Sequence, residues 1–537
     1  MQVPGVLFGV ECREPMLRGF ETMARLLALT LGPTGGHIVH QKVNTVEAEM
    51  LSDAATIARR FIELPDRAEN VGAMTMRHIV WHMRDKYGDG SATAAVLAWR
   101  VARKAHRLVV AGADPMALRR GIEKGTRAAL AALDGMSRPL EEAEQIAGIA
   151  NASIGEPEIG RLLGEMYEVL GPYGSIVIQP YLAARHDRAY YEGTRFPGEY
   201  VSPYLLSDPV RYIAALDDTY VLVADAHFES VDSVLTILDL VAQAGGKNLF
   251  FICKNMWDKA IGTLVHTNTQ DTVKAYAATI KPVEDLRIGM MQDVALLTGA
   301  TLVTDAAALP CRFDPRGLTI QDLGYAERIV ATRQYVMITG GRGDKQAVRE
   351  RARKLREQLR SLTDREQKEL LRERIGRLTG GVGELRVAAF TEAERTALTG
   401  KAAHAVKVVQ VGMEGGIISG GGAAYLAAIP ALDGVEAEGD EALGVRVVAR
   451  ALEEPLRVIA GNVRAQVPLV LAECREKGAG YGFDARRGKV VNMLDERIVD
   501  PTIVVKEALK RAVSGAMMLI TSETLVLHRK PPQSANP

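Results

Sequence analysis

The sequence predicts a multidomain α+β protein in which an α/β module is inserted into a mostly helical chain. With 537 residues, the chain is longer than a single domain usually is. Residues 1–135, and the residues from about 415 onward, show the apolar spacing of long helices. Residues 193–310 instead alternate short strand-like and helix-like segments. Helices on both sides of an alternating module indicate an insertion, and hence a discontinuous, hinged architecture.

The N-terminal part is expected to contain long helices. In residues 16–29 the side chains of Leu17, Phe20 and Met23 recur at helical spacing, and an Ala-rich segment follows at residues 93–108. The expected long helices are residues 16–29, 74–84 and 93–108.

Past Pro139 the segments become shorter. Short helices are expected at residues 141–150 and 162–170, followed by a strand at 175–178. The inserted module should hold a partly parallel sheet, because strands and helices alternate in it. Its expected strands are residues 220–224, 248–253, 273–277 and 301–304, and its expected helices are residues 231–244, 258–268 and 286–297.

The rest of the chain is expected to be helical. Residues 345–378 should form a charged helical pair, with a capping box of Thr363 and Glu366 opening the second helix. Further helices are expected at residues 423–429, 442–462 and 503–520.

Composition narrows the class of protein. The formal net charge is zero, so no bulk electrostatic argument favours nucleic acid or a membrane surface as a partner. The four cysteines lie far apart in the sequence, which favours buried thiols in a reducing compartment over a disulfide framework or a metal motif. Neither a signal peptide nor an apolar run of about 18 residues is found. We therefore expect a cytoplasmic protein without nucleic-acid or membrane partners.

Three glycine-rich segments are candidates for binding phosphate. Backbone amides at tight glycine turns and helix N-termini bind phosphate well. Residues 31–36 follow a helix and can form such a turn, although a plain helix end is the alternative. In residues 88–93, Asp89 can coordinate Mg²⁺, while Ser91, Thr93 and the helix amides can take phosphates. An ordinary N-cap cluster is the alternative for that segment.

Residues 419–422 form the third segment, which can approach a ribose or base closely. The chain has no Walker A sequence, which argues against a P-loop NTPase.

In this order and spacing, the segments resemble the group I chaperonins, the GroEL family. The likeness runs along nearly the whole chain and includes residues 69–73, 113–116, 200–204 and 499–501. The resemblance implies a GroEL-like subunit of three domains. The equatorial ATP-binding domain would comprise residues 1–135 and 415–537, the intermediate hinge domain residues 136–191 and 383–414, and the apical substrate-binding domain residues 192–382.

The resemblance also implies a site for ATP and Mg²⁺, with K⁺ as a further candidate cation. Asp89 would hold Mg²⁺, and Asp53 would lie near the γ-phosphate. Gly193 and Gly381 would serve as hinges. The other nucleotide contacts would come from Thr30, Leu31, Gly32, Pro33, Gly90, Ser91, Ala92, Thr93, Gly421, Asp484, Ala485 and Asp500.

In the apical domain the resemblance implies an apolar groove that binds unfolded polypeptides. The family's assembly is a ring, expected to be heptameric, and its co-chaperonin docks in the same groove. A second chaperonin paralogue is a further candidate partner. The groove residues would be Tyr200, Tyr204, Leu205, Leu235, Leu238, Ile261 and Val265. A buried helix is the alternative for residues 231–244, which are apolar on more than one face.

One position departs from the family in a way that bears on catalysis. His404 stands where the family has the aspartate that orients the attacking water. A neutral imidazole can accept one hydrogen bond, an imidazolium can stabilise phosphate charge, and a plain helix residue would leave the site inactive. We expect ATP binding with severely slowed hydrolysis, which leaves the chain's status as an enzyme open.

Three functions remain in view. The first is a chaperonin that assists folding in a ring. The second is a divergent paralogue that holds clients or joins a mixed chaperonin ring. The third, an enzyme for small molecules, has little support, because no Ser/His/Asp, Cys/His or metal-ligand cluster lies outside the nucleotide residues.

Overall fold

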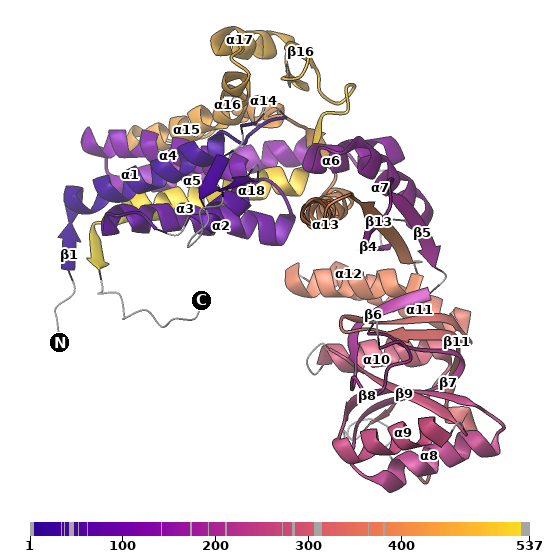
Figure 1. Ribbon diagram of the computed structural model, residues 1–537. Helices are drawn as coiled ribbons and strands as arrows, with labels where there is room; N and C mark the ends of the chain where they lie inside the picture. The colour runs from indigo at the N-terminus through magenta and orange to yellow at the C-terminus, as the bar shows by residue number, and fades with distance from the viewer. Residues whose placement is uncertain are drawn as a thin grey trace. The chain divides into compact units, whose positions relative to one another are not determined.

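The computed structural model divides the chain into two compact units, Met1–Glu165 with Ala389–Pro537 and Met166–Ala388 (Figure 1). The three-domain division implied by the resemblance stays a prediction. The structure describes residues 5–33, 35–36, 38–41, 48–51, 53–61, 63–140, 142–171, 174–191, 193–209, 212–270, 272–281, 285–304, 314–362, 365–379 and 382–527.

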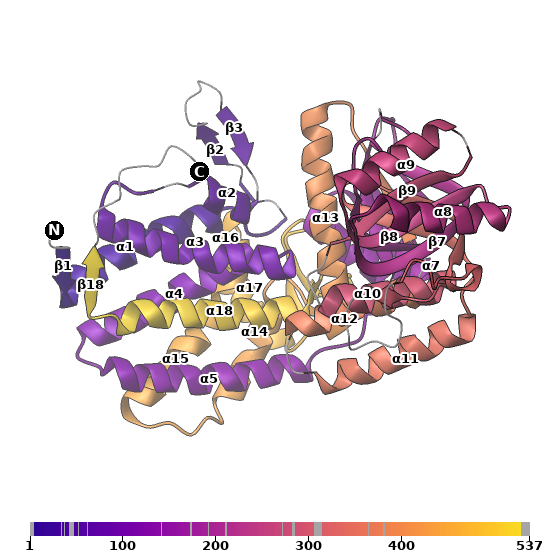
Figure 2. The same cartoon turned by 90° about the horizontal axis from the view of Figure 1, so that it is seen from below.

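The first unit is built around a bundle of long helices that run side by side (Figure 2). Their inward faces meet in one core, in which Phe20, Met76, Leu97, Val448 and Leu509 are fully buried. Burial of these apolar faces against one another is what stabilises the bundle. The helices are α1 (Gly9–Ala28), α3 (Arg67–Tyr87), α4 (Ser91–Val110), α5 (Pro115–Gly135), α15 (Gly439–Leu452) and α18 (Thr502–Thr521).

Smaller elements surround this bundle. The first and last described strands pair antiparallel, which ties the two ends of the chain together. The strands are β1 (Gly5–Phe8), β2 (Ile38–Gln41), β3 (Ala48–Leu51), β14 (Ile417–Ser419), β15 (Tyr481–Asp484), β16 (Lys489–Asn492), β17 (Val499–Pro501) and β18 (Thr524–Leu527). The helices are α2 (Ala54–Arg60), α6 (Ala143–Ile154), α13 (Glu392–Gly415), α14 (Ala423–Ala428), the short η2 (Ile429–Leu432), α16 (Glu454–Asn462) and α17 (Val467–Lys477), and α7 (Pro157–Leu170) spans the boundary of the units.

Two helix predictions need correction. Residues 442–462 form two helices, α15 and α16, which meet at Glu453. Pro455 has no N–H and occupies the first turn of α16, so a new helix starts there. At the N-terminal end, α1 begins at Gly9 and continues through Pro15, seven residues before the expected start.

The second unit contains a seven-stranded sheet that is partly parallel, as predicted. Strands β10, β7, β8 and β9 pair in parallel, while β11, β12 and β6 pair antiparallel. Since β7 pairs with both β11 and β8, the pairings close into a circuit. The strands are β6 (Gly193–Tyr200), β7 (Ala214–Phe228), β8 (Asn248–Met256), β9 (Lys274–Ile280), β10 (Val303–Thr304), β11 (Gly324–Ala331) and β12 (Tyr335–Gly341).

Apolar clusters cover both faces of this sheet. One packs α8 (Val231–Gln243) and α9 (Asp258–Gln270) against it, and the other packs α10 (Asp285–Thr298). The alternation of strand and helix in the sequence therefore corresponds to a sheet covered by helices.

The charged pair α11 (Lys345–Ser361) and α12 (Arg365–Thr379) forms as expected and buries Ala352, Leu355 and Ile375. Thr363 of the predicted capping box lies outside the described residues. A smaller sheet of β4 (Ser175–Tyr181), β13 (Val382–Ala388) and β5 (Asp187–Tyr191), and the short η1 (Ile320–Asp322), complete the unit. No helix among the described residues is long and apolar enough to cross a membrane.

Candidate nucleotide site

The loop between α3 and α4 has the form of an anion site. Gly88 and Gly90 adopt left-handed backbone conformations, with φ of +77° and +82°. Gly90 precedes α4, and no side chain caps that helix. The first-turn amides of Ser91, Ala92 and Thr93 therefore point out of a 20-residue helix, where partial positive charge favours phosphate. This arrangement suits the predicted phosphate contacts.

Some side chains of this loop pack against α3, and others remain accessible to a ligand. The hydroxyl of Ser91 is buried and donates to the carbonyl of Val80 at 3.1 Å, so it serves α3 rather than a ligand in this arrangement. Thr93 is half-buried. Asp89 accepts from the N–H of Gly90 at 2.6 Å and keeps solvent-accessible surface.

Asp89 and Asp500 make this region acidic. The protein around Asp89 raises its pKa by desolvation, and the charge of Asp53 adds to that shift. Burial and the charge of Asp89 raise the pKa of Asp500 to about 7, opposed by a hydrogen bond from the Gly421 amide. Two neighbouring carboxylates with raised pKa values fit a Mg²⁺ ion, which prefers one or two carboxylates plus phosphate oxygens and waters. No larger metal-ligand group occurs among the described residues.

The turn after α1 carries Thr30, Leu31, Gly32 and Pro33. Gly32 has a φ of +99°, and the Thr30 hydroxyl donates to the carbonyl of Leu27 at 2.8 Å. A residue that the sequence did not indicate holds this turn. Asn462, at the end of α16, donates to the carbonyls of Ala28 and Leu31 at 2.9 and 2.8 Å. It joins segments more than 400 positions apart.

The glycine segment 420–422 links β14 to α14 and positions Asp500. Strand β14 pairs with β17, which places Ile418 opposite Asp500. Gly421 and Gly422 have φ of +62° and +82°. A Cβ on Gly422 would lie 2.8 Å from the Leu456 nitrogen, so only glycine fits.

Asp484 is the last residue of β15, and its carboxylate accepts hydrogen bonds from the turn that follows. It accepts from the N–H groups of Arg486 and Arg487 at 2.9 and 3.2 Å. Ala485 is half-buried against a neighbouring apolar cluster. In this arrangement Asp484 shapes the turn that would face an adenosine, and its contact with a nucleotide stays a prediction.

Asp53 and His404 are brought together by a third residue, Arg84. Arg84 Nη1 donates to Asp53 Oδ2 and, at 2.5 Å, to Thr56 Oγ1. Its Nε and Nη2 atoms lie 3.1 and 2.8 Å from His404 Nε2. Asp53 Oδ2 also accepts from the Thr56 N–H at 2.7 Å, which caps α2. We call Asp53, Arg84 and His404 the clamp.

The contact with Arg84 bears on the three interpretations of His404. Burial lowers the pKa of His404, and the charge of Arg84 lowers it further, against the opposing charge of Asp53. A neutral ring has one acceptor nitrogen, and Arg84 occupies it at Nε2. Burial and the neighbouring guanidinium thus favour the uncharged ring, whose acceptor nitrogen faces Arg84.

The sequence did not indicate the contact between Arg84 and His404, because the two residues lie 320 positions apart. The only local signal is the place of Arg84 one helical turn before Gly88, whose N–H donates to the Arg84 carbonyl at 3.0 Å. The clamp adjoins the loop, since a Cβ on Gly88 would lie 3.0 Å from the His404 carbonyl oxygen.

The predicted groove residues divide into core and surface positions. Tyr204 is 82% exposed and Leu235 is 40% exposed, while Ile261 and Val265 are half-buried. Trp257, which the sequence did not indicate, is 54% exposed before α9. Leu205 and Leu238 are buried in the apolar cluster that packs α8 and α9 against the sheet. Tyr200 is buried in the other cluster, which packs α10, so the structure does not bring it together with them.

The two predicted hinge glycines differ in what the structure describes. Gly193 begins β6 opposite Thr339, where a Cβ would lie 2.7 Å from the Ile338 carbonyl oxygen. This close approach requires glycine at position 193. Gly381 lies outside the described residues.

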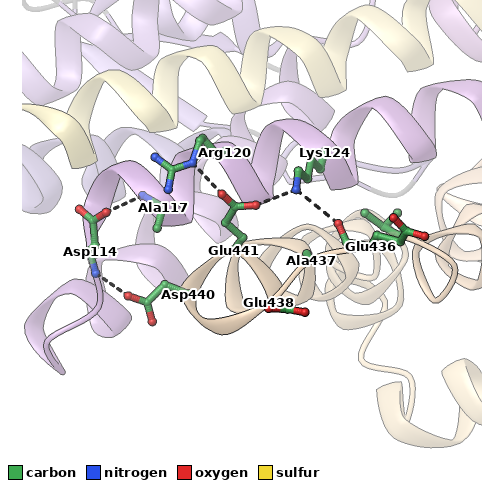
Figure 3. A pocket seen from close by; sticks show the side chains of 10 residues that line it. Asp114, Ala117, Arg120, Lys124, Glu436, Ala437, Glu438, Asp440 and Glu441 are labelled. Carbon is green, nitrogen blue, oxygen red and sulfur yellow. Dashed lines mark hydrogen bonds and ion pairs between the residues drawn. The ribbon is translucent and has the colours of Figure 1, made fainter.

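A separate hollow of about 910 Å³ lies between the start of α5 and residues 435–441 (Figure 3). The Glu441 carboxylate forms two ion pairs there: Oε1 lies 2.7 Å from Arg120 Nε, and Oε2 lies 2.7 Å from Lys124 Nζ. Asp440 accepts from the Asp114 N–H at 2.9 Å. The lining contains none of the predicted nucleotide residues.

The comparisons with known proteins agree with this fold. The structure is similar to chaperonin gp146 from the bacteriophage EL 2 (Pseudomonas aeruginosa), crystallised in the presence of ATP-BeFx. In crystal form I the TM-score is 0.76 at 17% identity, covering 98% of this chain and 99% of that one. In crystal form II it is 0.68 at the same identity and coverage. This is the fold of a chaperonin subunit, and it confirms the predicted multidomain α+β class.

The TCP-1/cpn60 chaperonin family profile matches residues 23–166 and 253–530. The chain therefore belongs to the TCP-1/cpn60 chaperonin family, which confirms the predicted relationship.

Proposed function

We propose that the chain is an ATP-binding chaperonin that binds non-native polypeptides and assists their folding in a ring, with hydrolysis impaired at His404. ATP with Mg²⁺, and K⁺ as a second cation, would bind at the loop of residues 88–93. The uncapped N-terminus of α4 beside Asp89 and Asp500 supports nucleotide binding. The observation that carries the impaired hydrolysis is the position of His404, a weak base in place of a carboxylate, half-buried beside the Arg84 guanidinium, since burial and that charge both lower the pKa of His404.

The client surface would be the exposed apolar side chains Tyr204, Leu235 and Trp257. Exposed apolar side chains on a folded protein mark interaction sites when they gather. Unfolded polypeptides supply complementary apolar segments. A heptameric ring, a co-chaperonin and a cytoplasmic location are parts of the same proposal. The buried free thiols Cys12, Cys253 and Cys474 are compatible with a reducing compartment.

A second candidate function follows from the same His404 contact. A subunit that binds ATP without turning it over would hold clients, or would act as a structural member of a mixed chaperonin ring. A working foldase would hydrolyse ATP and release a refolded client. A holdase would suppress client aggregation without turnover, and a mixed-ring subunit would co-purify with another chaperonin.

The test combines ATP turnover with a refolding assay on a chemically denatured client. Under the proposal, aggregation is suppressed while turnover is slow. Rapid turnover with ATP-dependent release would favour an ordinary foldase. No effect on aggregation would contradict both the foldase and the holdase, and would leave only the mixed-ring subunit, which co-purification with another chaperonin would test.

A further inference from the structure

Arg84 is the member of the clamp that contacts both of the others. Its side chain is 22% exposed and projects from the last turn of α3, one turn before the phosphate loop. Nη1 is fully engaged by Asp53 and Thr56, which fix the direction of the side chain. The guanidinium thus has one anchored edge and one edge that faces His404.

The edge that faces His404 is poorly matched to its partner. Nε and Nη2 present two parallel donors, a fork that suits the two oxygens of a carboxylate or phosphate. His404 offers one lone pair at Nε2 and no charge, so the two donors share one acceptor atom. Among the described residues, no other acceptor meets this edge.

The edge of Arg84 that faces His404 belongs to a clamp that adjoins the proposed phosphate loop. The charge of Asp53, which is bonded to Arg84, raises the pKa of Asp89, so clamp and loop act on one another. His404 adjoins Gly88 through its carbonyl oxygen. A phosphate chain bound at the α4 amides would therefore start at the loop that the clamp adjoins.

We propose that Arg84 is a specificity-determining residue that binds the terminal phosphate of a nucleoside triphosphate, displacing His404 from the Nε and Nη2 edge. This inference rests on the proposed nucleotide binding. The anion gains two charge-assisted hydrogen bonds where the neutral ring gave one shared acceptor. Asp53 and Thr56 keep Nη1 in place, so Arg84 need not reorient. A nucleoside diphosphate lacks the group that reaches this edge.

Arg84 therefore separates ATP from ADP by affinity. Charge-assisted hydrogen bonds contribute enough for a preference of about tenfold or more. The residue at position 404 determines the preference for ATP over ADP. A neutral side chain there can be displaced from Arg84 Nε and Nη2 by phosphate, whereas a carboxylate would stay paired with them. His404→Gln should keep the preference, and His404→Asp should lose it by pairing with Arg84.

The experiment measures dissociation constants of the full chain for ATP and ADP, each with Mg²⁺, by calorimetry. Arg84→Gln should weaken ATP binding about tenfold or more while ADP changes less than about twofold. Arg84→Lys should recover only part of the loss, since it lacks the fork. Arg77→Gln is the matched control on the same helix, because Arg77 binds the Phe61 carbonyl instead.

The possible results distinguish failure of the Arg84 inference from failure of the proposed nucleotide binding. Equal effects of Arg84→Gln on ATP and ADP, or no effect on either, would overturn the inference while leaving nucleotide binding in place. A wild-type chain that binds neither nucleotide would overturn the proposed function as well. An unchanged thermal unfolding temperature checks that each variant is folded. If Arg84→Gln does not fold, the contrast between His404→Asp and His404→Gln decides the question alone.

Discussion

Asp500 lies close enough to Asp89 for the negative charge of Asp89 to help burial raise the pKa of Asp500 to about 7. A carboxyl group with that pKa is partly protonated near neutral pH. In the unfolded chain it would lose its proton near pH 3.8. The folded protein without a bound cation therefore keeps a proton that the unfolded chain gives up.

The first prediction concerns pH and stability. Between about pH 4 and pH 7 the folded state binds more protons than the unfolded state at Asp500, so stability should fall as pH rises through this window. Asp500→Asn should flatten that part of the profile. Chemical unfolding in chelator at several pH values measures it. The same slope in wild type and variant would contradict the assignment.

The second prediction concerns Mg²⁺. A cation between Asp89 and Asp500 offsets their repulsion, so Mg²⁺ with ATP should raise the unfolding temperature more at pH 8 than at pH 6. Asp89→Asn should remove most of the Mg²⁺ effect. Thermal unfolding with and without chelator measures this. A Mg²⁺ effect that survives in Asp89→Asn would place the ion elsewhere.

The third prediction concerns hydrolysis at residue 404. Restoring a carboxylate with His404→Asp should give little turnover, because the new carboxylate pairs with Arg84. The double variant His404→Asp with Arg84→Asn frees that carboxylate and should turn over about a hundredfold faster than His404→Asp alone. Steady-state phosphate release measures both. Full activity in the single variant would show that Arg84 does not capture the carboxylate.

The fourth prediction concerns the phosphate loop. Gly90→Ala places a Cβ 2.7 Å from Val504 at a φ of +82°, so it should destabilise the fold by about 2 kcal/mol or more. Gly112 is the matched control. Its φ is +102°, but open space surrounds its Cβ position, so Gly112→Ala suffers backbone strain alone. Equal losses in urea unfolding would contradict the steric account.

The fifth prediction concerns the apolar surface. Tyr204→Ser and Leu235→Ser should weaken suppression of client aggregation without lowering the unfolding temperature, because both side chains are exposed. Leu205→Ala removes a buried side chain and should cost about 2–5 kcal/mol of stability. Aggregation assays and thermal unfolding together separate the two effects. Undiminished suppression in both Ser variants would place the client site elsewhere.

Local patterns in the sequence predicted the helices, the inserted sheet and the glycine segments, because apolar spacing and glycine turns are local properties. The break at Glu453 was missed because the apolar spacing continues across it while Pro455 starts a new helix. The clamp and the Asn462 contacts were missed because they join positions 320 and more than 400 residues apart. Burial of Leu205 and Leu238 depends on how the sheet and α8 pack, which periodicity alone does not determine.

The most direct test of the account measures ATP binding and ATP turnover in the same sample of the wild-type chain with Mg²⁺. We predict that the chain binds ATP and hydrolyses it below about 0.01 per second, a hundredfold under the low end of ordinary enzyme rates. Turnover near or above about 1 per second would contradict it, and would show that His404 does not impair the site.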